Sequence, residues 1–145
     1  MAIRGLSLND TAEYQCDVDP DKGTPDATVW IIGTLSSRVI AYINDNVTEF
    51  SPNQDGDEVS ATAVISSNKM AVERCRFGLR GWRNLLDCDG GQIEFKSEKA
   101  HIGRFWEQAV PYNLLDKIPL EVLLELSERV RKQNVVEDQE AKNSG

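Results

Sequence analysis

Leucines recur at helical spacing near the end of the chain. The central stripe consists of Leu123, Leu126 and Val130, and Leu120 and Leu124 widen it. Residues three and four apart lie on one face of a helix, so this pattern is typical of an amphipathic helix that packs against a core. Pro119 suits the first turn, where its missing N–H leaves no bond unmade, and Asn134 suits the end. Residues 135–145, VVEDQEAKNSG, are polar and predict a disordered acidic tail.

Two further helices are predicted earlier in the chain. In TLSSRVIAYINDN, residues 34–46, the apolar positions again follow helical spacing, with Thr34, Ser36 or Ser37 as the capping residue. The segment SSNKMAVERCRFGL, residues 66–79, predicts a helix that ends at Gly78 or Gly81, because glycine tolerates the left-handed conformation of a C-terminal cap.

Strands are predicted between these helices. ATVWIIG, residues 27–33, is rich in β-branched and aromatic residues and ends in glycine. VSATAVI, residues 59–65, alternates as a strand does, although it could equally lead into the following helix, and the polar run 51–58 before it predicts a loop. DCDGGQIEF predicts a turn that enters a strand with Ile93 and Phe95 on one face. We expect Phe105 and Trp106 to anchor the next segment in the core.

The resulting fold class is α+β. One small globular domain covers residues 1–134, with several helices and a small antiparallel sheet or hairpin. Residues 1–26 form an arm or loop in this interpretation, with a short strand near AEYQC. The length of 145 residues suits one domain with one core.

The charge balance argues against nucleic acid as a partner. The net charge is −8 and the pI is about 4.7, so the surface as a whole repels phosphate backbones. The arginines at 74, 76, 80 and 83 form a basic cluster, which predicts either a helix face that balances acidic neighbours or a phosphate site. No apolar run approaches the roughly 18 residues of a membrane-spanning helix, and the first residues lack a signal-peptide pattern, so we expect a cytosolic protein.

Catalytic and metal-binding patterns are absent from the sequence. Cys16, Cys75 and Cys88 are an odd number without close pairs, and together with His101 they lack the paired spacing of a structural zinc site. The acidic run DVDPDKG, residues 17–23, begins like a calcium loop but lacks the glycine and glutamate that such a loop requires. Phosphate loops, dinucleotide fingerprints and nucleophile elbows are also missing. The sequence therefore predicts no catalytic, cofactor or metal site from motifs of these kinds.

A family resemblance covers most of residues 6–140. The order is SLNDTAEYQC, ATVWIIGTLSSRVIAYINDN, VERCRFGLRGWRNLLDCDGGQIEF and LLDKIPLEVLLELSERVRKQN. This arrangement resembles the tail assembly chaperones of long-tailed bacteriophages. The resemblance implies a largely helical, non-enzymatic protein that binds the tape measure protein and helps recruit tail tube subunits in the cytoplasm of the infected host. It also implies that the protein leaves the finished particle.

Two alternatives remain open at this stage. One is a virion structural component, such as a head-tail connector, a tail protein or a decoration protein, and the other is an enzyme or enzyme inhibitor. Whether the chain forms a homo-oligomer is also open. The candidate protein-binding residues are the aromatics Trp82, Phe105, Trp106 and Tyr112, of which we expect at least two in the core.

Overall fold

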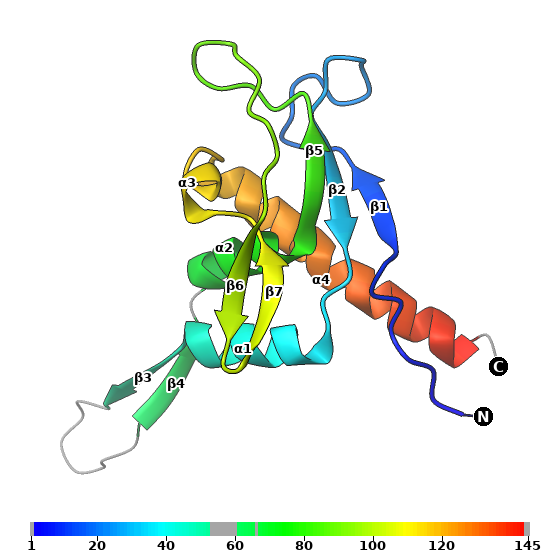
Figure 1. Ribbon diagram of the computed structural model, residues 1–145, viewed down its shortest axis with the longest axis vertical. Helices are drawn as coiled ribbons and strands as arrows, with labels where there is room; N and C mark the ends of the chain where they lie inside the picture. The colour runs from blue at the N-terminus through cyan, green and yellow to red at the C-terminus, as the bar shows by residue number, and fades with distance from the viewer. Residues whose placement is uncertain (1, 53–60, 66, 144–145) are drawn as a thin grey trace.

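Three antiparallel strands form the central sheet, and a long helix crosses one face of it (Figure 1). The strands are β1 (Thr11–Tyr14), β2 (Val29–Gly33) and β5 (Leu79–Arg83), in the order β1-β2-β5. The computed structural model describes the backbone of residues 2–52, 61–65 and 67–143. Trp30 lies opposite Trp82 in the register, and a bulge at Ile31 and Ile32 shifts the pairing toward the end of β2.

The remaining elements lie around this sheet. The helices of the described residues are α1 (Ser37–Val47), α2 (Ser67–Gly78), α3 (Tyr112–Leu115) and α4 (Leu120–Asn143). One hairpin pairs β3 (Thr48–Pro52) with β4 (Ala61–Ile65), and a second pairs β6 (Glu98–Ile102) with β7 (Phe105–Ala109). The structure is an α+β fold with a C-terminal amphipathic helix, as the hydrophobic pattern predicts. Most of the predicted loop 51–58 lies outside the described residues.

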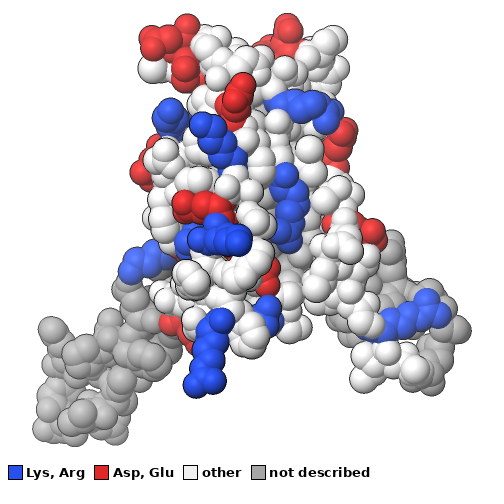
Figure 2. All heavy atoms as spheres, viewed as in Figure 1, with Lys and Arg blue, Asp and Glu red and all other residues white. Residues whose placement is uncertain are grey.

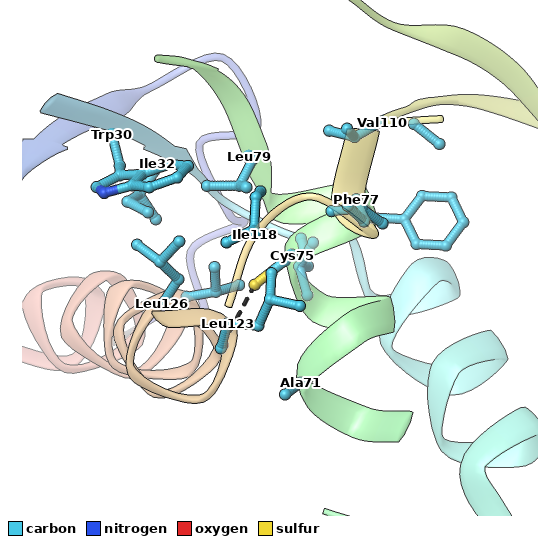
Figure 3. Close-up of a cluster of buried hydrophobic side chains, with 14 of the residues drawn as sticks. Trp30, Ile32, Ala71, Cys75, Phe77, Leu79, Val110, Ile118, Leu123 and Leu126 are labelled. Carbon is cyan, nitrogen blue, oxygen red and sulfur yellow. Dashed lines mark hydrogen bonds between the residues drawn. The ribbon is translucent and has the colours of Figure 1, made fainter. Parts of the chain in front are cut away.

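The core lies between the sheet, α2 and α4 (Figure 3). Trp30 and Ile32 project from β2 toward Leu123 and Leu126 of α4, and Cys75 of α2 donates its S–H to the Leu123 carbonyl at 3.4 Å. Leu126 is fully buried, and full burial of such a side chain is worth about 1.5–3 kcal/mol. The predicted central stripe of the last helix is therefore correct.

The edges of that helix differ from the prediction. Leu120 and Leu124 are exposed, so the buried stripe is narrower than expected. The helix does not end at Asn134 but continues to Asn143, through most of the segment predicted as a tail. Asn134 instead holds the turn before α1: its amide oxygen accepts a bond from the Leu35 N–H at 3.1 Å, and its amide nitrogen donates to the Leu35 carbonyl at 2.9 Å.

A second side chain of α4 fixes the N-terminal arm. The Glu125 carboxylate accepts hydrogen bonds from the Tyr14 hydroxyl, from the Asp17 N–H at 2.7 Å and from the Val18 N–H at 3.3 Å. The short strand predicted near AEYQC is present as β1, which pairs with β2. The arm is therefore tied to the fold at both its backbone and its side chains.

The predicted end of α2 at Gly78 is confirmed, but the predicted left-handed glycine cap is wrong. The helix ends at Gly78, yet neither Gly78 nor Gly81 has a positive φ, because the chain passes directly from α2 into β5. A Cβ atom on Gly78 would lie 2.7 Å and 2.8 Å from the two methyl carbons of Val130, so this glycine allows α2 and α4 to approach closely. The left-handed residue is Asn84, at φ 60°, just after β5.

The predicted strand after the glycine turn is displaced. Gly90 has a φ of 84° in the turn, as the glycine pair suggests, but residues 93–97 form no strand, and β6 begins at Glu98. A single bridge between Leu86 and Gln92 closes the turn. Ile93 nevertheless reaches the core, because its carbonyl accepts the indole N–H of Trp82 at 2.7 Å.

Candidate functional site

Trp82 is a core residue and offers no binding surface. Its ring is 7% exposed and makes edge contacts with Trp30 and Phe95, at centroid distances of 5.7 Å and 4.9 Å. The contacts with these rings and the indole bond to Ile93 satisfy both its apolar body and its polar N–H. Trp82 is the one member of the four candidate aromatics that is buried, so the expectation of at least two in the core is wrong.

Phe105 and Trp106 lie at the tip of the β6–β7 hairpin and are exposed by 54% and 49%. Gly103 has a φ of 60° at the first central position of the tight turn, which fits a type II′ connection. Along β7 the side chains alternate, so Phe105 and Trp106 point to opposite faces of the hairpin. The prediction that both anchor the core is wrong, because the hairpin contributes Ala100, Ile102 and Ala109 to the core and not these two rings.

Cations cover part of each exposed ring. The Arg38 guanidinium of α1 lies 4.1 Å from the Phe105 centroid, and its Nη2 bonds the Glu107 carboxylate at 3.1 Å. The Lys99 ammonium lies 4.4 Å from the Trp106 centroid. Such cation–π contacts at exposed sites are worth about 0.5–1 kcal/mol each and favour the observed positions of the rings. The hairpin tip therefore presents two ordered aromatic rings.

Tyr112 lies apart from this tip, in α3 beyond the far end of β7. Its hydroxyl donates to the Glu73 carboxylate at 2.5 Å and accepts from Arg76 Nη1 at 3.0 Å, while Arg76 also stacks on the ring at 4.4 Å. Partial burial and the Glu73 bond raise the pKa of Tyr112 to about 12. The ring is 46% exposed, but its polar end is fully engaged, so Tyr112 serves the packing of α3 on α2.

A groove of about 470 Å³ lies beside β7. We call it the β7 groove. Its walls come from the N-terminal arm at Leu8, the turn between β2 and α1 at Thr34, the end of α2 at Phe77, and β7 at Trp106 and Gln108. Arg80 also lines this groove. Apolar and polar groups thus share the surface, as in many peptide-binding clefts.

Arg80 reaches the groove from β5 by crossing Gly33. A Cβ atom on Gly33 would lie 2.2 Å from Arg80 Nε, so the crossing requires glycine at that position. Arg80 Nη2 donates to the Thr34 carbonyl at 3.0 Å, and burial lowers the pKa of the guanidinium, an effect that Glu107 opposes. Among the described residues no carboxylate lies within ion-pair distance of Arg80.

The other arginines of the basic cluster point to different partners. Arg76 pairs with Glu73 at 3.4 Å, and Arg83 pairs with Glu13 at 2.9 Å. The cluster is not one helix face, because α2 ends before Arg80 and Arg83, which belong to β5. Balance by acidic neighbours therefore describes Arg76 and Arg83, and the cluster offers no shared phosphate site.

The candidate metal ligands make structural contacts instead. Cys16 and Cys75 are buried free thiols, and Cys88 is exposed. In the acidic turn, the Asp19 carboxylate accepts bonds from the N–H groups of Asp21 and Thr28, both at 2.9 Å. Within residues 2–52, 61–65 and 67–143, no three His, Cys, Asp or Glu side chains are placed to hold a metal ion.

Comparison with known proteins returned no match, whether to a family model, to a curated protein or to a solved structure. In the described part of the chain no helix has the length and apolar character needed to cross a membrane. Function therefore has to be argued from the surface of the molecule.

Sequence reasoning found the aromatic tip but missed the groove beside it. HIGRFWEQ carries a signal that could have located the hairpin, since a Gly-containing pair between alternating residues is typical of a two-residue turn. Arg80 could not be found in this way. Its position depends on the passage of its side chain over Gly33, which is 47 positions earlier in the chain and is brought close only by the sheet.

Proposed function

We propose that this chain is a non-enzymatic tail assembly chaperone of a long-tailed bacteriophage. In this role it binds the tape measure protein and helps recruit tail tube subunits in the cytoplasm of the infected host. The observation that carries the proposal is the pair of ordered, half-exposed rings of Phe105 and Trp106 beside the β7 groove. Aromatic and arginine side chains are enriched where proteins bind one another.

The surface around this pair supports a protein-binding role. Trp106 lines the β7 groove itself, and Phe105 is held by Arg38 on the neighbouring face of the hairpin. A hydrophobic client can therefore contact rings whose positions are already favoured in the free protein, which lowers the entropy cost of binding. The family resemblance stated above supplies the identity of the client.

A second candidate is a structural component of the virion. The strand content favours it, because the chaperone resemblance implies a largely helical protein whereas this chain has a three-stranded sheet and two hairpins. The two candidates differ in where the protein ends up. Mass spectrometry of purified particles should find a chaperone missing or scarce, and a structural component at a fixed stoichiometry.

Co-expression tests the chaperone proposal directly. The tape measure protein encoded with this chain should gain soluble yield in its presence, and the double variant Phe105→Ser, Trp106→Ser should lose most of that gain. The control is Leu124→Ser, which alters another exposed apolar side chain, on α4. The proposal fails if the yield stays flat while the wild-type chain is folded, or if the control loses as much as the double variant.

A further inference from the structure

The outer edge of β7 is an unpaired strand edge. β6 and β7 form a two-stranded sheet, and in its register Ile102 pairs with Phe105 across the two-residue turn. Residues next to such a turn exchange hydrogen bonds, and the bonded pairs then alternate along the strands. The backbone groups of Trp106 and Gln108 therefore point away from β6, and among the described residues no backbone or side-chain group bonds to them.

The same two residues line the β7 groove. Unpaired N–H and C=O groups of an edge strand are a template for another strand, unless charge, proline or a covering segment blocks them. Strand β7 contains no proline that would block its outer edge. The groove is therefore open to a chain in extended conformation, which could form hydrogen bonds with both residues.

The Arg80 guanidinium favours an acidic partner for the groove. Figure 2 shows many acidic side chains at the end of this face formed by the loops 15–28 and 84–97, and side chains of both signs over its middle. Arg80 is half buried in the groove wall and has no ion-pair partner among the described residues. The nearby Glu107 is neutralised by Arg38, at 3.1 Å.

We propose that the β7 groove binds an extended segment of a partner protein, which adds as a strand to the outer edge of β7 and places a carboxylate against Arg80. Alternate side chains of that segment would face the groove, where Leu8 and Trp106 offer apolar contact. The carboxylate would satisfy the guanidinium N–H groups that the Thr34 carbonyl leaves available. This proposal goes beyond the proposed function, because it depends on the groove alone and not on which protein supplies the segment.

The first test uses a displayed library of random peptides about nine residues long, which is within the length of ordinary strands. Selection on the folded chain should enrich peptides with Asp or Glu at one position between β-branched residues. The enriched peptide, made synthetically, should bind at least about tenfold more weakly to Arg80→Gln, since a charge-assisted bond is lost. Binding to Arg83→Gln should be unchanged, because Arg83 is on the same strand but pairs with Glu13.

The second test addresses the strand pairing. Gln108→Pro removes one outward N–H without breaking a bond to β6, so the chain should fold but lose the peptide, while Gln108→Ala should keep it. In the peptide, alternate backbone N–H groups point to opposite edges of the strand. N-methylation of the set that faces β7 should abolish binding, whereas N-methylation of the other set should leave binding intact. The proposal is overturned if no acidic peptide is enriched, if Arg80→Gln binds as wild type does, or if both N-methylated sets bind equally.

Discussion

Gly78→Ala should destabilise the protein although alanine is the better helix former. Gly78 is the last residue of α2, and an added Cβ would lie 2.7 Å and 2.8 Å from the two methyl carbons of Val130. Val130 is fully buried and β-branched, so it has little freedom to turn away. Overpacking of this kind costs about 1–3 kcal/mol, and the helix propensity of alanine returns at most about 0.5–1 kcal/mol. The two ranges leave a net loss of up to about 2.5 kcal/mol, with a midpoint of about 1 kcal/mol.

Urea unfolding measures this loss. Trp30 and Trp82 are buried, so their fluorescence should report the transition, and the m-value should not change if the native fold is kept. The double variant Gly78→Ala, Val130→Ala tests whether the contact between the added methyl group and Val130 causes this loss. Val130→Ala should cost about 2 kcal/mol alone and at least about 1 kcal/mol less when Ala occupies position 78, because the new methyl group fills part of the space.

Gly5→Ala is the control for this prediction. Gly5→Ala introduces a methyl group with nothing within 4 Å and should change the free energy of unfolding by less than about 0.5 kcal/mol. If Gly78→Ala is as stable as wild type, or if the two substitutions are additive, then α2 and α4 do not meet at this point and the packing argument is wrong.

Two further predictions concern burial. Leu126→Ala should lower the free energy of unfolding by about 2–5 kcal/mol, because Leu126 is fully buried on α4. Leu124→Ala, on the exposed side of the same helix, should lower it far less. Equal melting temperatures for the two variants would show that the buried face of α4 is not the one described. A thiol reagent at pH 8 should label Cys88 quickly and leave Cys16 and Cys75 unlabelled until urea is added. Burial raises the pKa of the Cys16 thiol to about 12, and Cys75 is enclosed in the core. Fast labelling of all three thiols in the native protein would contradict the prediction.

The fold class was predictable because hydrophobic period is a local property. The spacing of Leu123, Leu126 and Val130 identifies a helix and its buried centre whatever packs against it. The width of the buried stripe cannot be read from local spacing, because it depends on how much of the helix surface the sheet and α2 cover. Leu120 and Leu124 lie beyond the covered surface and are exposed. Helix ends were harder still. Asn134 has the side chain of a cap, but its hydrogen bonds go to a segment 99 positions away.

The site was predictable only as a set of residue types. Aromatic residues can be core or surface, and the decision depends on which strand face the rest of the protein covers. Trp82 lies in the central sheet, between Trp30 and Phe95, whereas Trp106 lies near the hairpin tip on the face that is exposed. The groove requires three segments to meet beside β7, and Arg80 enters it only because Gly33 lies beneath its side chain.

The attachment of the arm to Glu125 has a consequence for synthesis on the ribosome. Tyr14 and Glu125 are 111 positions apart, so at about 5–20 residues per second Tyr14 is made roughly 6–22 s before its partner. Contacts of such long sequence separation form late, because they close large loops. We expect protease to cut the arm in nascent chains stalled before Glu125 emerges and to spare it afterwards. The arm is thus translated well before Glu125 but becomes ordered only after Glu125 has left the ribosome.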